Sequence, residues 1–241
     1  ITHNWILHIY KIQLSVIFLL KISLLNVIPD SFDWREKNII GNYQSQSSIS
    51  WIDPFNRMLE SLYALEKGNY VNFSSQMLLD CVPQTSDFIG DQIANALSLI
   101  TKNGIAKDSD YPYRGTRGTC KSSKYIDMKV TKYKKLGPNA NEEEMKQFLY
   151  ENGPFVVLLN SKPLMTYSAG IIDLDETKCP SSGIDQAFLL VGYGSAAGKD
   201  YWIIKGFFGK IWGEKGYFRI IRGKGACGIN QSAFIPFVEF E

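Results

Sequence analysis

The stretch YWIIKGFFGKIWGEKGY, residues 201–217, carries more information about the fold than any other part of the chain. It begins with YWIIK, a run rich in aromatic and β-branched residues, and leads into a second such run, YFRII, at 217–221. Glycines and lysines, which often interrupt strands, lie between the two runs. The stretch therefore predicts two short strands joined by a glycine-rich loop.

The same texture is found elsewhere in the second half of the sequence. FVVLLN at 155–160 and AFLLVGY at 187–193 are short apolar runs rich in β-formers and bounded by residues that break regular structure. Such runs are typical of buried strands. The second half is therefore predicted to be mainly β.

The first half instead favours helices. Residues 54–67 and 91–102 both place apolar side chains at helical spacing, and a glycine follows each segment closely. A third helix is expected to start at Asn141, with Glu144 three residues later as in a capping box, and to end at the Gly-Pro of 153–154. Helices followed by strands indicate an α+β protein with two unlike lobes, divided near residue 135.

Composition and charge exclude several classes of protein. The chain has 241 residues, is 45% hydrophobic and 21% charged, and carries a formal net charge of +2. This is an ordinary globular composition, with no like-charged block that would favour nucleic acid as a partner. We expect a folded protein that does not bind nucleic acid.

Cysteines and histidines are too scattered for a metal site. The only two histidines are His3 and His8, and a zinc site needs clustered ligands. The even number of cysteines favours disulfides over free buried thiols, with three possible pairings. These cysteines are Cys81, Cys120, Cys179 and Cys227. No metal and no cofactor is predicted.

The N-terminal residues 1–28 form an apolar leader. Lys11 and Lys21 interrupt it, and its uninterrupted core, 14–20, is short for a membrane span. A signal-like segment is the first interpretation. A leader that is not native to the protein and a membrane anchor are the alternatives, and a membrane is a partner only if the leader is retained. The leader is left out of the fold prediction.

Two N-glycosylation acceptor patterns agree with a secretory route. Asn72 and Asn230 each begin an Asn-x-Ser triplet. Together with the even cysteine count, they indicate an oxidising compartment. We expect a secreted or endolysosomal protein.

Separate motifs, in the family's order, resemble the papain-like cysteine proteases, the group that includes cathepsins L and O. The motifs are IPDSFDWRE (28–36), QSQSSISW (44–51), LLDC (78–81), YPY (111–113), GTC (118–120), GP (153–154), AGI (169–171), DQAFLLVGYG (185–194), the stretch 201–217, and ACGI (226–229). The resemblance covers residues 28–241. It implies a two-lobe papain-like fold: a helical left lobe at 29–135, an antiparallel β-barrel-like right lobe at 136–241, and a cleft between them.

The resemblance also implies which cysteines pair. It joins Cys81 to Cys120 and Cys179 to Cys227. A third bridge that is usual in the family is missing, because its two positions hold Ser47 and Phe88. Both ends are changed together, which leaves no unpaired thiol.

The positions that carry the family's chemistry hold other residues. The reaction needs a thiolate, an imidazole to activate it, a group that orients the imidazole, and donors for the oxyanion. By resemblance these positions hold Ser50, Gln186 and Gly206, while Gln44 remains as the oxyanion donor. Phe208 stands where a tryptophan shields the orienting group. The sequence thus predicts an inactive homologue.

The absence of a base does not depend on the alignment, because residues 9–241 contain no histidine. A serine hydroxyl is far less acidic than a thiol and needs a base to attack a carbonyl. Asp185 and Lys205 adjoin two of the changed positions, but neighbours on a strand point to opposite faces. A hydrolase rebuilt around Ser50 is therefore the weaker alternative.

The dipeptide Asp53-Pro54 permits two interpretations of the helix that follows Ser50. In the first, Asp53 is the N-cap and the helix begins about three residues late, which leaves Ser50 in a preceding turn. In the second, Pro54 occupies the first turn of an unshifted helix, where its missing N–H costs little. In both, the Asp53 carboxylate would disfavour an anionic nucleophile.

The expected function is therefore binding in the cleft. The residues predicted to line it are Gln44, Trp51, Gly90, Asp91, Ile184, Ala187 and Trp212, although core packing is the simpler role for Trp51 and Trp212. The predicted partners are protein or peptide ligands, such as cystatin-like protease inhibitors or protease substrates. A weakly active serine-type hydrolase and a decaying paralogue without a selected function are the alternatives.

Overall fold

The computed structural model describes residues 28–41, 51–121 and 128–240, and the chain divides into two units, 1–30 and 31–241. Of the first unit only 28–30 are described, so the predicted leader, apart from its last residue Ile28, lies outside the described residues. The second unit contains all the helices and strands given below.

Four α-helices and four short 3-10 turns occur among the described residues. They are η1 (Trp34–Lys37), α2 (Ile52–Lys67), α3 (Ser75–Cys81), α4 (Ile89–Asn103), α5 (Glu142–Asn152), η2 (Lys162–Leu164), η3 (Ser181–Gly183) and η4 (Ala226–Gly228). The three helices predicted from the sequence correspond to α2, α4 and α5. Helix α3 was not predicted.

Helix α2 shows how the sequence sets its helices. Phe55, Met58 and Leu59 are fully buried on one face, as the apolar spacing predicts. The helix ends at Gly68, which has a left-handed conformation (φ 71°) and donates its N–H to the carbonyl of Ala64.

The start of α2 bears on the two interpretations of Asp53-Pro54. The helix begins at Ile52, so the prediction that Asp53 is its N-cap is wrong. Trp51 occupies that position and makes no side-chain capping bond. Pro54 lies in the first turn, where its missing N–H has no intrahelical partner to lose. The first-turn position of Pro54 agrees with the second interpretation, but whether the helix start is shifted relative to Ser50 stays a prediction. Ser50 itself lies outside the described residues.

The strands form one eight-stranded sheet. They are β1 (Phe32–Asp33), β2 (Met128–Leu136), β3 (Phe155–Leu159), β4 (Ile171–Ile172), β5 (Gln186–Ala196), β6 (Lys199–Lys205), β7 (Tyr217–Ile221) and β8 (Ala233–Phe240). The order is β2-β8-β3-β5-β6-β7-β4, and β1 pairs with β5. All pairs are antiparallel except β4 with β7. The four predicted strands match β3, β5, β6 and β7, and the α+β class is confirmed.

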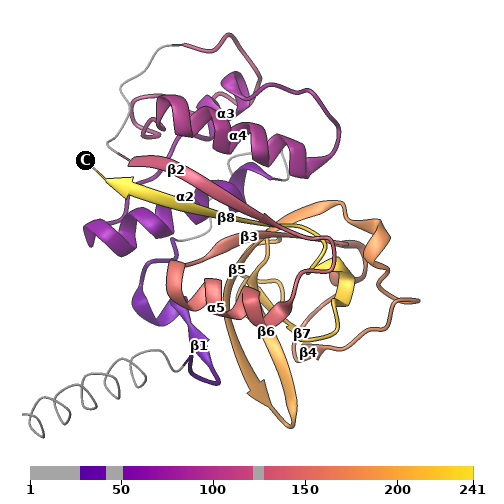
Figure 1. Ribbon diagram of the computed structural model, residues 1–241. Coiled ribbons are helices and arrows are strands. Elements are labelled where there is room, and N and C mark those ends of the chain that lie inside the picture. The colour runs from indigo at the N-terminus through magenta and orange to yellow at the C-terminus, as the bar shows by residue number, and fades with distance from the viewer. Residues whose placement is uncertain (1–27, 42–50, 122–127, 241) are drawn as a thin grey trace, which may run out of the picture. The chain divides into compact units, whose positions relative to one another are not determined.

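The long pairing of β2 with β8 was not predicted. These strands lie side by side over most of their length, and α4 packs against β2 (Figure 1). Helix α2 packs against β3 and β5. Strand β2 ends the sheet, and its exposed Lys129, Lys132 and Lys135 discourage further strand pairing there. The predicted lobe boundary near residue 135 falls within β2 and stays a prediction.

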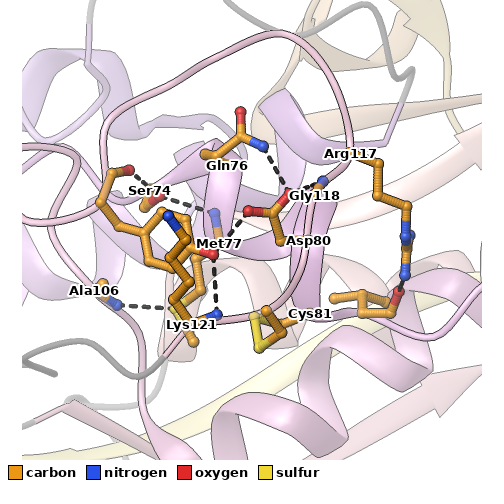
Figure 2. The surroundings of a disulfide bond; sticks show 12 residues. Ser74, Gln76, Met77, Asp80, Cys81, Ala106, Arg117, Gly118 and Lys121 are labelled. Atoms are coloured by element: carbon orange, nitrogen blue, oxygen red, sulfur yellow. Dashed lines mark hydrogen bonds between the residues drawn. A yellow bond between two sulfur atoms is a disulfide. The ribbon is translucent and has the colours of Figure 1, made fainter.

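Both disulfides implied by the resemblance are present, Cys81–Cys120 and Cys179–Cys227. The first lies beside the carboxylate of Asp80, which accepts hydrogen bonds from Gln76 and from the backbone N–H of Gly118 (Figure 2). Burial alone would raise the pKa of Asp80, but these donors hold it below its ordinary value. The disulfide and the carboxylate thus fasten α3 to the 118–120 segment together.

Candidate functional site

Gln186 stands where the resemblance places the family's histidine. It is the first residue of β5, opposite Leu159 of β3, and its side chain is buried. Its amide nitrogen Nε2 donates a hydrogen bond to the carbonyl oxygen of Ala187, 3.2 Å away. An amide has no proton equilibrium near neutral pH and cannot act as a general base. This position therefore supplies no proton acceptor of the kind that the reaction requires.

Gly206 stands where the resemblance places the orienting asparagine, directly after β6. Its N–H donates to the carbonyl of Gly216 at 2.8 Å. A Cβ built on Gly206 would come within 2.5 Å of ring atom Cζ3 of Trp212. The space beside Gly206 is thus already filled, and an asparagine there would displace the indole.

The indole of Trp212 is held in place from several sides. Its Nε1 donates to the carbonyl oxygen of Met165 at 3.0 Å. Its ring lies 4.7 Å from that of Phe208 and 5.5 Å from that of Tyr167, measured between centroids. These contacts assign Trp212 mainly to packing of the loop after β6. This was the simpler role expected from the sequence.

Trp51 is also a packing residue. Only 3% of its surface is exposed, and its Nε1 donates to Oε1 of Gln92 in α4 at 2.6 Å. Its ring meets that of Phe55 edge-on. The hydrogen bond ties the start of α2 to α4, so the residue fixes two helices rather than presenting its ring to a ligand.

The other predicted cleft residues differ in exposure. Ala187 is buried in β5, and Gly90 is buried in the first turn of α4, where a Cβ would meet the ring of Phe88 at 2.5 Å. Asp91 is exposed and Ile184, which follows η3, is partly exposed. Only Asp91 and Ile184 of this group could offer much surface to a ligand. Gln44, like Ser50, lies outside the described residues.

Asp185 and Lys205, which adjoin two of the changed positions, both make contacts with described residues. Oδ1 of Asp185 accepts a hydrogen bond from the N–H of Ser161 at 2.7 Å. Nζ of Lys205 lies 3.3 Å from the carbonyl oxygen of Gly41 and 3.4 Å from the hydroxyl of Tyr217. Ser50, the partner that either would need in a rebuilt catalytic pair, lies outside the described residues, so this alternative stays a prediction.

A buried charge cluster lies along α2 and was not predicted. Nε of Arg57 contacts Oδ1 of Asp53 at 3.3 Å, and its NH1 contacts Oε2 of Glu60 at 2.6 Å. The hydroxyl of Tyr70 donates to Glu60, and the N–H of Phe73 does so at 2.9 Å. The sequence signal was available, because Arg57 and Glu60 lie among apolar residues on the inward side of the helix.

Burial shifts the pKa values of this region. It raises the pKa of Glu60 to about 7, although Arg57 and Tyr70 favour the ionised carboxylate. It also raises the pKa of Asp53, against the opposing effects of Arg57 and Lys205. Burial lowers the pKa of Lys205 to about 8. Arg57 and Lys205 thus offset the negative charge of Asp53. This weakens the predicted repulsion between Asp53 and an anionic nucleophile.

Neither a metal centre nor a membrane span is found in the described ranges. No His, Cys, Asp and Glu side chains there form a group of three that could hold a metal ion. No helix in the same part of the chain is both long and apolar enough to cross a bilayer.

Comparison with known proteins identifies the family. Residues 28–237 match the family described as papain family cysteine protease. The chain is 36% identical over 208 residues to viral cathepsin of Adoxophyes honmai nucleopolyhedrovirus, covering 85% of the chain and 60% of that protein. It is 36% identical over 224 residues to P34 probable thiol protease of Glycine max, covering 88% and 59%. The chain belongs to the papain family of cysteine proteases.

Solved structures agree with the family assignment. The proform of the ragweed pollen allergen Amb a 11, a cysteine protease, superposes with a TM-score of 0.76 at 30% identity, covering 88% of this chain and 66% of that one. Digestive procathepsin L 3 of Tenebrio molitor gives 0.73 at 29% identity, with 88% and 70% covered. The fold is therefore the two-lobe papain-like fold. The chain spans about 60% of the length of the viral cathepsin and of P34 probable thiol protease.

Proposed function

We propose that this protein is a papain-family member that has lost catalysis and acts by binding proteins or peptides. The observation that carries the proposal is at Gln186: the residue that the resemblance places at the histidine position has a buried amide, which hydrogen-bonds a neighbouring carbonyl. The absence of histidine from residues 9–241 supports it, because no other imidazole could take over.

The surroundings of Gly206 support the same conclusion. An imidazole placed at residue 186 would find no amide to orient it, and Trp212 occupies the space where that amide would lie. Loss of a complete catalytic unit costs on the order of a millionfold in kcat. What remains is the binding that the scaffold itself can provide.

The retained framework favours a binding role over simple decay. The sheet and the two disulfides are formed, and the buried carboxylate of Asp80 is hydrogen-bonded. Each of these features stabilises the folded state. In a chain with no selected function, mutations that remove them would not be selected against. The ligands that suit such a scaffold are peptide substrates of active relatives and cystatin-like inhibitors. Both would be met in secreted or endolysosomal fluids, where disulfides persist.

An assay for hydrolysis tests the catalytic half of the proposal. The purified protein and a Ser50→Ala variant are incubated with a peptide library between pH 4.5 and 8, beside an active papain-family protease. We expect no turnover above buffer for either protein. Cleavage by the wild type that Ser50→Ala abolishes would establish the serine-type alternative instead.

A binding assay tests the other half. The protein is titrated calorimetrically with a cystatin-type inhibitor and, separately, cross-linked in its native fluid and analysed by mass spectrometry. We expect saturable binding by a cooperatively folded protein. A protein without a sharp thermal transition that also retains no ligand would indicate the decaying paralogue.

A further inference from the structure

A cavity of about 280 Å³ opens where the chain leaves β6. Its walls come from the end of β6, the glycine-rich loop that follows, the start of β7 and the segment after η1. We call it the Lys205 pocket. The residues that line it are Ile40, Gly41, Lys205, Gly206, Gly209, Lys210, Lys215, Gly216 and Tyr217.

The lining of the Lys205 pocket carries charge of one sign. Among the residues that the structure describes, it includes three lysines, at 205, 210 and 215, and no aspartate or glutamate. Lys210 and Lys215 are exposed at the rim, while Lys205 is 8% exposed. Three lysines around one small cavity give it a positive potential, and the charge of the buried Lys205 is screened by water less than those of the two exposed lysines. An anion that enters the pocket would be attracted by all three lysines.

The contacts of Lys205 leave its charge weakly compensated. Its two described acceptors, the carbonyl of Gly41 and the hydroxyl of Tyr217, are neutral and lie at 3.3 and 3.4 Å. These distances exceed the usual range for an N–H···O bond. The carboxylate of Asp53, which acts on Lys205 through space, is itself in contact with Arg57. A buried ammonium in this situation gains from an anionic partner.

The glycines let a ligand approach the backbone. Gly206, Gly209 and Gly216 all line the pocket, and a Cβ built on Gly209 would meet nothing within 4 Å. Gly209 and Gly216 have positive φ angles of 89° and 91°, which glycine adopts without strain. The pocket therefore combines accessible main chain with cationic side chains.

We propose that the Lys205 pocket is a binding site for a compact oxyanion, a carboxylate, sulfate or phosphate group held between the ammonium groups of Lys205, Lys210 and Lys215. The proposal goes beyond the loss of catalysis and does not depend on it. Because Gly206 borders the pocket, the group can be an acidic side chain of a peptide ligand. It can equally be a free anion, and the chemistry of recognition is the same.

Sulfate is the probe for this proposal, since its charge is constant across the pH range of interest. Titration calorimetry at fixed ionic strength compares the wild type with Lys205→Met, Lys210→Ala and Lys215→Ala. Lys102→Ala, which removes an exposed lysine of α4 far along the chain from the pocket, is the matched control. We expect sulfate affinity to fall about 10- to 100-fold in Lys205→Met. We expect a fall of about 2- to 5-fold in each rim variant and none in the control.

The rim variants keep the test decisive if Lys205→Met does not fold, because Lys210 and Lys215 are exposed. Wild-type protein that fails to bind sulfate, or binds it equally well with all three lysines replaced in turn, overturns the proposal. A second arm compares a short peptide containing one glutamate with the same peptide containing glutamine. Preference for the glutamate peptide that is lost in the lysine variants identifies the source as a peptide. Sulfate binding alone identifies it as a free anion.

The pH dependence provides an independent readout. Burial lowers the pKa of Lys205 to about 8, so its ammonium is lost well before that of an ordinary lysine. The groups that act on it are Asp53 and Arg57 of α2, Arg35 of η1, Lys210 of the loop and Tyr217 of β7. Sulfate affinity should fall as the pH rises through about 8, and the fall should be absent in Lys205→Met. A profile that is the same in both proteins would contradict the assignment of Lys205.

Discussion

The ring of Trp212 lies against Gly206 so closely that a single methyl group on Gly206 would come within 2.5 Å of it. The two residues therefore exclude any larger side chain at the position where active relatives are expected to orient their histidine. Gly206 also borders the Lys205 pocket.

Replacing Gly206 with asparagine should destabilise the fold. The new side chain must push aside an indole that Met165 and Phe208 hold in place, and such overpacking costs about 1–3 kcal/mol. Denaturant unfolding measures this cost. In a Trp212→Ala background the same substitution should cost at least about 0.5 kcal/mol less. Equal costs in the two backgrounds would show that the ring is not the obstacle.

Restoring the nucleophile and base should restore some cysteine protease activity. Ser50→Cys alone should remain inactive, because the thiol still has no imidazole partner. Combining it with Gln186→His should raise kcat/KM for a peptide substrate by about 10²–10⁴. Adding Gly206→Asn should give no further gain while Trp212 is present. The measurement is steady-state hydrolysis with a thiol-directed inhibitor as control, and activity of Ser50→Cys by itself would contradict the account.

Stability should pass through a minimum between about pH 7 and 8. The pKa of Glu60 is raised to about 7, so its stabilising contribution is complete below pH 4.5 and is lost as the pH rises to about 7. The pKa of Lys205 is lowered to about 8, so its contribution is complete above pH 10.5 and is lost as the pH falls through 8.

The pH profile of chemical unfolding free energy checks this prediction, with each limb worth roughly 1–3 kcal/mol. Glu60→Gln should flatten the profile between pH 4.5 and 7, and Lys205→Met should flatten it above 8. A single maximum near neutrality that neither substitution alters would refute the assignment.

Glu142, the first residue of α5, should be important for stability. Its carboxylate accepts hydrogen bonds from Nε1 of Trp202 at 2.6 Å and from the N–H groups of Gly223 and Gly225 at 2.9 and 2.6 Å. Glu142→Gln would turn an amide NH₂ toward these donors and remove a charge from the helix start. We expect a loss of about 1–3 kcal/mol.

The matched control for Glu142 lies in the same turn of the same helix. Glu144 pairs with Lys134, and both side chains are 42% exposed. Glu144→Gln should therefore change the unfolding free energy by less than about 0.5 kcal/mol. Thermal melts of the two variants, run side by side, separate the buried carboxylate from general effects of charge. A similar loss in both would mean that position in the helix, not burial, is what matters.

The sequence predicted those elements whose pattern is local. Helices α2 and α4 have apolar periodicity and glycine stops, α5 was predicted from its capping-box-like start and its Gly-Pro end, and β7 lies where YFRII predicted a strand. Helix α3 was missed because only seven residues carry its pattern. Strand β2 was missed because its sequence, MKVTKYKKL, is dominated by lysine and owes its structure to pairing with β8.

The candidate site was predictable only in part. Resemblance gave the identities at Gln186 and Gly206, since those depend on motifs that survive in the sequence. That Trp212 fills the space beside Gly206 depends on the conformation of the whole 206–216 loop. The Lys205 pocket is likewise formed by segments more than 150 residues apart, Ile40 and Gly41 on one side and the β6–β7 loop on the other. The spacing of residues in the sequence does not predict that these two segments lie side by side.

The pairing of β2 with β8 also constrains how the chain can be made. About a hundred residues separate the two strands, and synthesis on a ribosome proceeds at about 5–20 residues per second. A nascent chain thus carries β2 for several seconds or more before its partner emerges from the exit tunnel. During this interval the lysines along β2 disfavour its aggregation with other chains. The speed of translation therefore affects the yield of folded protein.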